Sequence, residues 1–562
     1  NEAPTAASTA GCSGRTCEFD ARGSFDPDED QLTYTWAFGD GSTGDGVDPS
    51  HTYASDGPRT VTLTVSDGEL EDTATRSVAT SPISPAPGHT RLPPDTPNTS
   101  MPYIGDGEIW DIEIVGNRAY VAGTFTTIAN RAGTNRTTYQ QAGLAAFNAT
   151  TGVVDPAFRP VFTNGGVEAV EASPDGTKLF IGGSFGTVNG LTHKAIARID
   201  PATGAPIESF TANGNGKVQE LAVTNTTVYA GGRFSLINNV PRGALVALDA
   251  STGEVRSDFV NNLSGGIGTN GDLTVQRLKL TRDEGRLLVV HTGRQVNGQD
   301  RYGIAIINTR TQQLTPWRSR LWEENLQYVG GIQRIYGGDI SPDGSWFAVT
   351  SGSGGDRPPI NDTVIAFPIS GGDDVQPLWI SRAFDSIYAV AISEQAVFIG
   401  GHFAWNESPT SPQPWPGLTD QGYGTGQGLS GYGLGDAVVK RQHLGALDPE
   451  DGTALEWNPT SNSFEGNKHI ELTPRGLWTG GDATTQGEYN VGRLAFFDFN
   501  AIPNGNGVET VIVDPIEGRI KPVAEEFTVS GTATAAAGVR SVQVEIMDRQ
   551  SRRYLNDDLT TW

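Results

Sequence analysis

The chain has few basic residues, little cysteine and no long apolar run. Of its 562 residues, 39 are lysine or arginine and 65 are aspartate or glutamate, so the formal net charge at pH 7 is −26. Nucleic acids and anionic membranes are bound through clustered positive charge, so we expect neither as a partner. No apolar stretch approaches the roughly 18 residues that a membrane-spanning helix needs, so we expect no membrane insertion.

Only two cysteines are present, Cys12 and Cys17. They are too few for a metal centre, and their spacing differs from the Cys-x-x-Cys of redox motifs. The alternatives are a small disulfide at a strand edge and two free thiols, and we favour the disulfide. Disulfides form in oxidising compartments. Together with the acidic composition, this predicts an extracellular protein, either secreted or attached to a cell surface.

Histidine offers little catalytic chemistry. The seven histidines are scattered, with no His-x-His or His-Glu-x-x-His arrangement for zinc. His402 and His443 could approach one another, although structural histidines are the more ordinary interpretation. We therefore lean towards a protein that is not an enzyme.

The most informative feature present is a repeat, found seven times between Trp110 and Asp498. Each copy has one hydrophobic strand, a second strand that ends near Gly-Gly-x-Phe, and a third that ends in Asp or Asn before Thr-Gly. The plainest second strands are 178–185, 227–234 and 396–403. A period of about 50–60 residues with some four short strands per copy is typical of propeller blades. The sequence predicts an all-β fold containing a seven-bladed β-propeller over 101–500.

The first strand of each copy is a hexapeptide that is apolar at positions one, four and six. The copies are 109–114, 167–172, 218–223, 275–280, 335–340, 387–392 and 467–472, of which 335–340 is degenerate and 467–472 has lost its first apolar residue. We expect positions two and three to lie near the mouth of the central channel, where propellers usually bind ligands. The predicted ligand-binding residues there are Trp110, Asp111, Glu168, Gln219, Glu220, Arg277, Tyr388 and His469. The alternative is that they hydrogen-bond loop backbones and water.

A long insertion in the sixth copy, 404–436, is rich in glycine, proline and aromatic residues. Long loops in compact domains are usually functional or disordered. Tryptophan and tyrosine beside small polar residues suit sugar rings, which predicts carbohydrate binding. The aromatic residues concerned are Trp405, Trp415, Tyr423 and Tyr432. The alternative is that they fold the loop onto the propeller.

Residues 1–80 form a separate β-unit. Segments 33–38 and 60–65 alternate with period two, as half-buried strands do. The order of 34–36, 38–41, 51–53 and 60–65 closely resembles that of a PKD domain, an immunoglobulin-like β-sandwich. The resemblance implies that Trp36 fills the core between the sheets and that the domain serves spacing and binding.

An acidic turn in this unit is a candidate calcium site. Asp26, Asp28 and Asp30 alternate along it and could supply the hard oxygen ligands that calcium prefers. The alternative is a solvated turn. We expect no other cofactor.

Two further segments complete the organisation. Residues 81–100 are a proline-rich linker, and we expect about 91–107 to complete the seventh blade. The propeller resembles those of secreted bacterial proteins. Residues 508–562 resemble a bacterial immunoglobulin-like domain that is cut short, so we expect the natural protein to continue beyond Trp562.

These features favour an extracellular bacterial binding or adhesion protein whose propeller face recognises carbohydrate or another surface polymer. One alternative is a secreted polysaccharide hydrolase or lyase that uses Asp111, Glu168 or Glu220 at the mouth. Another is a structural subunit that self-assembles into a surface layer or filament.

Overall fold

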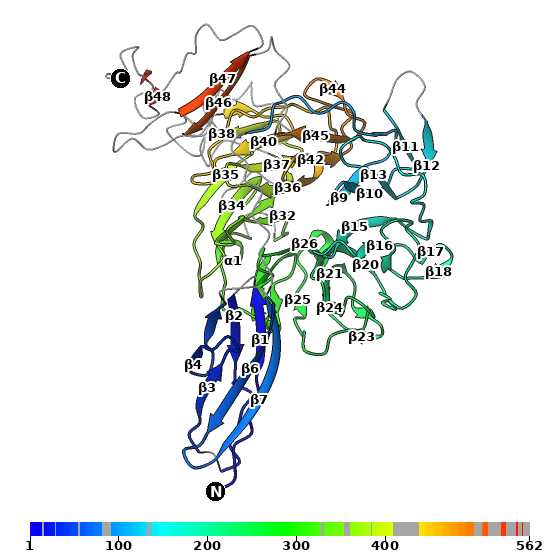
Figure 1. Ribbon diagram of the computed structural model, residues 1–562. Helices are drawn as coiled ribbons and strands as arrows, with labels where there is room; N and C mark the ends of the chain where they lie inside the picture. The colour runs from blue at the N-terminus through cyan, green and yellow to red at the C-terminus, as the bar shows by residue number, and fades with distance from the viewer. Residues whose placement is uncertain are drawn as a thin grey trace. The chain divides into compact units, whose positions relative to one another are not determined.

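The computed structural model describes residues 1–13, 16–28, 30–53, 57–80, 92–131, 137–326, 331–352, 360–383, 385–407, 438–499, 508–514, 530–535, 547–548 and 553–554. Strands dominate it (Figure 1), and within these ranges the only helical elements are α1 (Leu321–Asn325) and a 3-10 turn, Thr269–Gly271. The predicted all-β class is therefore confirmed. Residues 1–86 belong to one compact unit and most of the propeller to another.

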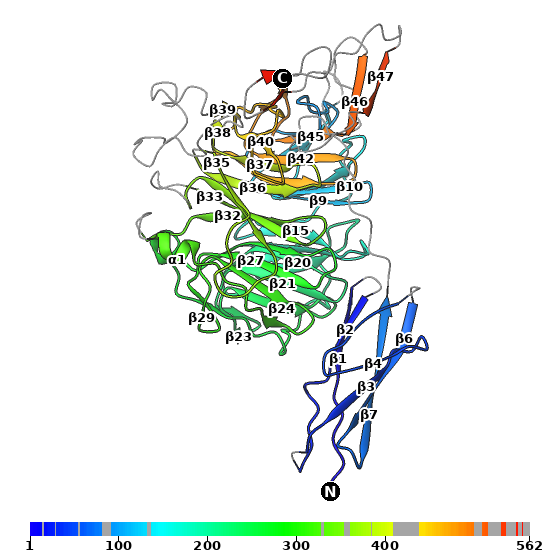
Figure 2. The ribbon, with the colours of Figure 1, turned by 90° about the vertical axis from the view of Figure 1, so that its left-hand side faces the viewer.

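The N-terminal unit is a sandwich of two antiparallel sheets (Figure 2). One sheet has the order β1 (Thr9–Ser13), β2 (Thr16–Asp20), β5 (Ser50–Thr52), and the other β4 (Thr43–Asp45), β3 (Thr33–Ala37), β6 (Gly57–Ser66), β7 (Glu71–Thr80). Trp36 is buried between them and donates a 2.9 Å hydrogen bond from Nε1 to the carbonyl of Gly46. The indole thus fills the core while its one polar group is satisfied.

His51 in this unit has a structural setting. Its Nε2 lies 2.8 Å from Oδ2 of Asp40, and its ring stacks on Phe38 with centroids 4.2 Å apart. Hydrogen bonds from Ser42 and then His51 hold the pKa of Asp40 well below its usual range. Gly39 in the same turn has a φ of +81°, and a Cβ there would lie 2.4 Å from the carbonyl oxygen of Thr60, so the turn requires glycine.

The two cysteines lie on neighbouring strands. The register of β1 and β2 places Cys12 directly opposite Cys17, which is buried. The side chain of Cys12 lies outside the described residues, so the disulfide stays a prediction that this register permits.

The propeller consists of seven antiparallel sheets, each with an inner, a second and a third strand. Blades one to three are β9 (Ile109–Val115), β10 (Arg118–Gly123), β13 (Leu144–Asn148); β15 (Val167–Ala172), β16 (Leu179–Gly183), β19 (Ile196–Ile199); and β20 (Lys217–Val223), β21 (Thr227–Arg233), β24 (Leu245–Asp249). Blades four and five are β26 (Val275–Leu280), β27 (Arg286–His291), β30 (Ile304–Asn308), β31 (Gln313–Leu314); and β32 (Ile335–Ile340), β33 (Trp346–Ser351), β34 (Thr363–Pro368), β35 (Trp379–Arg382). Blades six and seven are β36 (Ile387–Ile392), β37 (Val397–Gly401), β40 (Leu444–Leu447); and β41 (Asn467–Leu472), β42 (Gly476–Gly481), β45 (Leu494–Asp498).

The repeated Gly-Gly at the end of the second strand has a steric cause. A Cβ on Gly182 would lie 2.7 Å from Cγ1 of Val218, on the inner strand of the next blade. A Cβ on Gly183 would lie 2.1 Å from the carbonyl oxygen of Gly166, just before the inner strand of its own blade. The motif therefore marks where one blade packs on the next with no room for side chains.

The inner strand of blade five departs from the hexapeptide pattern because a small residue there is compensated by a larger residue in blade four. Blade four has Val290 where blades two, three, six and seven have the first glycine of the pair, and the facing residue of blade five is Gly338. A Cβ on Gly338 would lie 2.8 Å from Cγ2 of Val290. The bulk missing from one strand is thus supplied by its neighbour, which keeps the interface packed.

Short hairpins between the second and third strands form a further layer at one end of the blades. They are β11 (Thr127–Ala129) with β12 (Thr138–Gln140), β17 (Thr187–Val188) with β18 (Leu191–Thr192), β22 (Leu236–Ile237) with β23 (Val240–Pro241), β28 (Gln295–Val296) with β29 (Gln299–Asp300), β38 (Trp405–Glu407) with β39 (Val438–Lys440), and β43 (Thr485–Gln486) with β44 (Tyr489–Asn490). Asn189 and Gly190 have φ values of 50° and 82°, which is the type I′ geometry favoured in two-residue hairpins. Hairpins pair with incoming segments such as β14 (Phe162–Thr163) and β25 (Leu263–Ser264).

The segment before the first blade lies against the last. The amide of Asn98 donates to the carbonyl of Phe496 on β45, and Asn458 donates to Oδ1 of Asp95. β8 (Tyr103–Ile104) then pairs with β11 of blade one. These contacts are the ones that the predicted closure by residues 91–107 requires, although residue 91 lies outside the described ranges.

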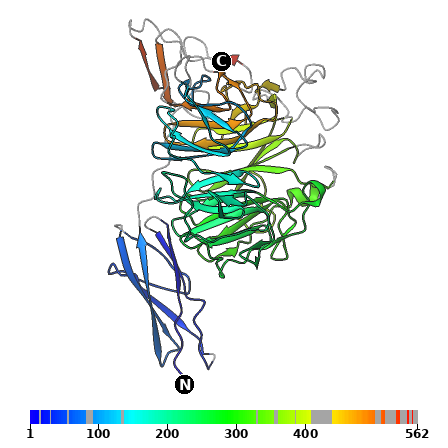
Figure 3. The same cartoon turned by 90° about the vertical axis from the view of Figure 1, so that its right-hand side faces the viewer.

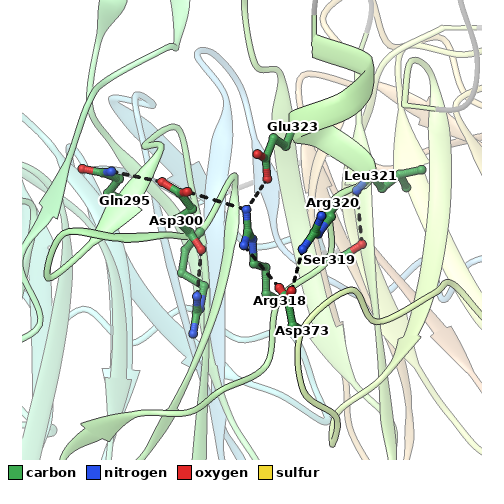
Figure 4. A network of polar contacts seen from close by, with 9 residues as sticks. Gln295, Asp300, Arg318, Ser319, Arg320, Leu321, Glu323 and Asp373 are labelled. Carbon is green, nitrogen blue, oxygen red and sulfur yellow. Dashed lines mark hydrogen bonds and ion pairs between the residues drawn. The ribbon is translucent and has the colours of Figure 1, made fainter.

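Arg318 is the centre of an ionic network at the edge of blades four and five (Figure 4). It lies 2.6 Å from Glu323 of α1, 3.2 Å from Asp373 and 3.6 Å from Asp300, while Arg320 lies 2.6 Å from Asp373. The network joins the hairpin of blade four to the segment that leads into blade five.

Replacing Arg318 with alanine is expected to lower the free energy of unfolding by about 1–2 kcal/mol, more than Arg320→Ala does. A single exposed ion pair contributes at most about 1 kcal/mol, but Arg318 is only 19% exposed and contacts three carboxylates. Urea denaturation at low and at high salt measures this, and the deficit should shrink at high salt. A larger cost for Arg320→Ala would contradict the assignment.

Beyond the propeller, β46 (Val508–Asp514) pairs with β47 (Ser530–Ala535) and β48 (Met547–Asp548) with β49 (Arg553–Tyr554). The rest of 508–562 lies outside the described residues. The C-terminal immunoglobulin-like domain therefore stays a prediction.

Candidate functional site

β-Bulges aim side chains at the mouth of the channel. In blade two, Val167 pairs with Gly183 and Ala169 with Gly182, so Glu168 between them has no partner. The same register shift occurs in four other blades, where the residue at the second hexapeptide position has no pairing partner on the second strand: Trp110, Gln219, Tyr388 and Lys468. In blade five the shift covers two residues, Tyr336 and Gly337. Such bulges re-aim side chains and are frequent beside binding sites.

The bulge residues interact around the mouth. In blades six and seven, Nζ of Lys468 lies 4.1 Å from the ring centroid of Tyr388, whose ring is 5.2 Å from that of Tyr336 in an edge-to-face arrangement. In blades one to three, Nζ of Lys217 lies 2.7 Å from Oε2 of Glu168 and 6.0 Å from the ring of Trp110. Three of the predicted mouth residues, Trp110, Glu168 and Tyr388, thus belong to these two groups of contacts.

The predicted carboxylates join neighbouring blades. Asp111 of blade one accepts the amide of Val170 in blade two at 2.7 Å, and its other oxygen lies 3.1 Å from Nδ1 of His469. Glu220 of blade three pairs with Arg277 of blade four. An inner strand has an open edge along the channel, and its amides need acceptors. Asp111 accepts one such amide, and Glu220 accepts the amide of Leu278.

A second ring of charge lies deeper, at the fifth hexapeptide position. Glu113 accepts the amide of Ala172, and Asp339 accepts that of Ile392 at 2.7 Å. Burial raises the pKa of Glu171 in this ring to about 8, and, despite Arg277, it raises the pKa of Glu220 at the third position to about 7. Burial and then the neighbouring Glu171 raise the pKa of Glu113 well above its usual range. Part of this ring is therefore protonated near neutral pH.

Blades one and two are drawn in blue-cyan to green-cyan in Figure 3. A cavity of about 620 Å³ opens beside Trp110, among residues of these two blades. Its walls come from the second strand and hairpin of blade one and from the segment that leads into blade two. Trp110, Gln140, Arg159, Phe162 and Ser184 line it among others. This volume is in the range of small-molecule sites, and apolar walls with a few polar groups are typical of them.

The blade-six insertion is only partly visible. Trp405 begins β38 and pairs with Lys440, whereas Trp415, Tyr423 and Tyr432 lie outside the described residues. The rings of His402 and His443 are 6.0 Å apart, and His402 lies 3.3 Å from Asp385. Burial lowers the pKa of His443 to about 4, so this ring is neutral and suited to a structural role.

One carboxylate of the acidic turn in the N-terminal unit accepts backbone amides of the same turn. Oδ1 of Asp26 accepts the amides of Asp28 at 2.8 Å and Asp30 at 3.2 Å. Across the described ranges, no group of three or more His, Cys, Asp or Glu side chains is placed to hold a metal ion. The calcium site at Asp26, Asp28 and Asp30 therefore stays a prediction, beside the alternative of a turn stabilised by its own carboxylate.

Sequence reasoning did not find Lys217, which precedes the hexapeptide, or Arg159, which lies outside the repeat's strands. The cavity could not be found from strand patterns because its walls come from loops and from a hairpin. The bulges could have been found from the sequence. In a regular strand, apolar residues alternate with period two, whereas each hexapeptide has two residues between its first and second apolar positions.

The PKD domain family model matches residues 1–81. These residues form a PKD domain. A microbial collagenase of Vibrio alginolyticus is 40% identical to this chain over 99 residues, which are 17% of this chain and 12% of the collagenase. The match therefore spans about an eighth of the collagenase.

Two solved structures extend the comparison. The PKD1 domain of Vibrio anguillarum Epp is 32% identical and covers 15% of this chain and 98% of its own, with a TM-score of 0.14. The WD40 propeller domain of Doa1 is 10% identical and covers 71% of this chain and 96% of its own, with a TM-score of 0.40. No helix in the described residues is long and apolar enough to cross a membrane.

Proposed function

We propose that this is an extracellular bacterial binding protein whose propeller mouth recognises carbohydrate. The cavity beside Trp110 carries the proposal, because it joins an aromatic wall to amide and hydroxyl groups at the mouth. Sugar rings offer apolar C–H faces that suit aromatic walls and hydroxyls that suit such polar groups. The extracellular setting is supported by the PKD domain, which this chain shares with a microbial collagenase.

Binding is favoured over hydrolysis by the state of the three candidate catalytic carboxylates. Asp111 accepts a backbone amide, Glu168 pairs with Lys217, and Glu220 pairs with Arg277. A glycosidase needs two carboxyl groups that face a shared space about 5–10 Å across. Groups already engaged in joining blades are poorly suited to that task.

Replacing Trp110 with alanine is expected to weaken glycan binding about 5- to 30-fold, because loss of an aromatic wall removes roughly 1–2 kcal/mol. A glycan array on the intact chain identifies the ligand, and calorimetry then compares the variants. Trp110→Phe should retain part of the affinity.

The matched control is Tyr489→Ala, an exposed aromatic residue at the tip of the blade-seven hairpin. It should bind as the unaltered chain does, and thermal melting should show both variants folded. Equal affinity for Trp110→Ala and the unaltered chain would refute the proposed site. A chain that binds no glycan at all would refute the function.

A further inference from the structure

Arg159 projects from the segment that leads into blade two and lines the cavity beside Trp110. It is exposed, and its Nε donates a 3.0 Å hydrogen bond to the carbonyl of Pro156. In the part of the chain that the structure describes, no carboxylate lies within ion-pair distance of its guanidinium. Arg159 therefore brings a positive charge to the lining of a cavity that is large enough for a ligand.

Three other basic residues on blades one to three have acidic partners. Arg118 lies 2.6 Å from Asp155, Lys217 lies 2.7 Å from Glu168, and Arg233 pairs with Asp272. Other described cations of these blades, such as Lys194 and Arg198, have no carboxylate within ion-pair distance either, but Arg159 is the one basic residue among those that line the cavity. That this cation lines the cavity points to a ligand that brings its own negative charge.

We infer that the cavity binds an anionic sugar, with Arg159 recognising its carboxylate or sulfate ester. This inference rests on the proposed carbohydrate-binding function and names its ligand class. A planar guanidinium can donate two parallel hydrogen bonds to either anion, which gives both affinity and orientation. The sugar ring then lies towards Trp110, and the Gln140 amide can donate to or accept from ring hydroxyls.

The test compares three oligosaccharides of galactose-type units: an oligogalacturonate, a sulfated oligogalactan and a neutral oligogalactan. Titration calorimetry of the intact chain should show binding at least about tenfold tighter to one of the anionic oligomers than to the neutral one. Arg159→Ala should remove that preference, and Arg159→Lys should retain part of it because lysine keeps the charge but loses the paired geometry.

The matched control is Arg233→Ala, which removes a neighbouring arginine that already has a partner and should leave the preference unchanged. The carboxylate and sulfate arms identify which anion is recognised. Binding of neutral oligomers alone, with dependence on Trp110 but not on Arg159, would overturn this inference and leave the proposed function standing. An Arg159→Ala variant that keeps the anionic preference would also overturn it, whereas failure of every glycan would overturn both.

Discussion

Replacing Trp478 with alanine is expected to lower the free energy of unfolding of the propeller by about 3–5 kcal/mol, the range for large buried aromatic side chains. Trp478 lies on β42 of the last blade and is 2% exposed. Its ring lies 4.4 Å from that of Phe496 and 5.9 Å from that of Phe147, which belongs to the first blade. The same cluster includes Met101 and Ile104 of the segment before blade one. One truncation therefore weakens the seam where the ring closes.

Trp346→Ala is the matched control. Trp346 is half-buried on β33 and packs edge-to-face against Trp379 of the same blade, with centroids 6.1 Å apart. Its loss should cost clearly less, because part of its surface already contacts water. Urea denaturation followed by circular dichroism measures both variants. Equal costs would show that the seam between the last and first blades is no more critical than the packing within a blade.

The sequence predicted the propeller because each blade repeats the same packing problem. Gly182 and Gly183 have no space for side chains, and so the Gly-Gly pair recurs wherever blades meet in the same way. It did not reveal why 335–340 departs from the pattern, because the reason is Val290 in another blade. Exchanges of volume between strands far apart in the chain cannot be deduced from one strand alone.

The candidate site was predictable only in part. Positions two and three of the hexapeptide include the bulge residues Trp110 and Tyr388, and their role in binding stays a prediction. The sequence could not show that Asp111 accepts an amide of the next blade, because that bond depends on how two blades pack. Carboxylates that look catalytic in a sequence can therefore be acceptors for an open strand edge.

The stability of the propeller is expected to fall as pH rises from about 5 to about 8. Burial raises the pKa of Glu171 to about 8 and that of Glu220 to about 7. In this window the unfolded chain releases these protons while the folded chain keeps them, so deprotonation favours the unfolded state. The other charged groups that face the channel are Asp111, Glu113, Arg277, Lys279, Asp339, His469 and Glu471.

Two of these groups change the stability of the fold only outside this pH window: Glu471, whose effect on stability has the opposite sign, and Lys279, whose effect has the same sign. The pKa of Glu471 is lowered because Lys279 outweighs its burial, so its stabilising effect is lost only in acid. The pKa of Lys279 is raised by Glu471 and other carboxylates despite its burial, so its contribution persists until strongly alkaline pH. Neither effect changes between pH 5 and pH 8, and the raised carboxyl groups therefore set the slope.

Glu171→Gln isolates the effect, since glutamine resembles the protonated acid and cannot ionise. The variant should match the unaltered chain near pH 5 and exceed its unfolding free energy at pH 8 by a few kcal/mol, on the order that a shift of several pKa units implies. Urea denaturation across pH 5–8 measures the difference, with the exposed Glu254→Gln as a control that leaves the slope unchanged. The contrary outcome is that unfolding free energy changes with pH equally in Glu171→Gln and in the unaltered chain. Glu171 would then be ionised in the folded channel. The repulsion among the channel carboxylates would be balanced by Lys279 and Arg277 instead of by bound protons.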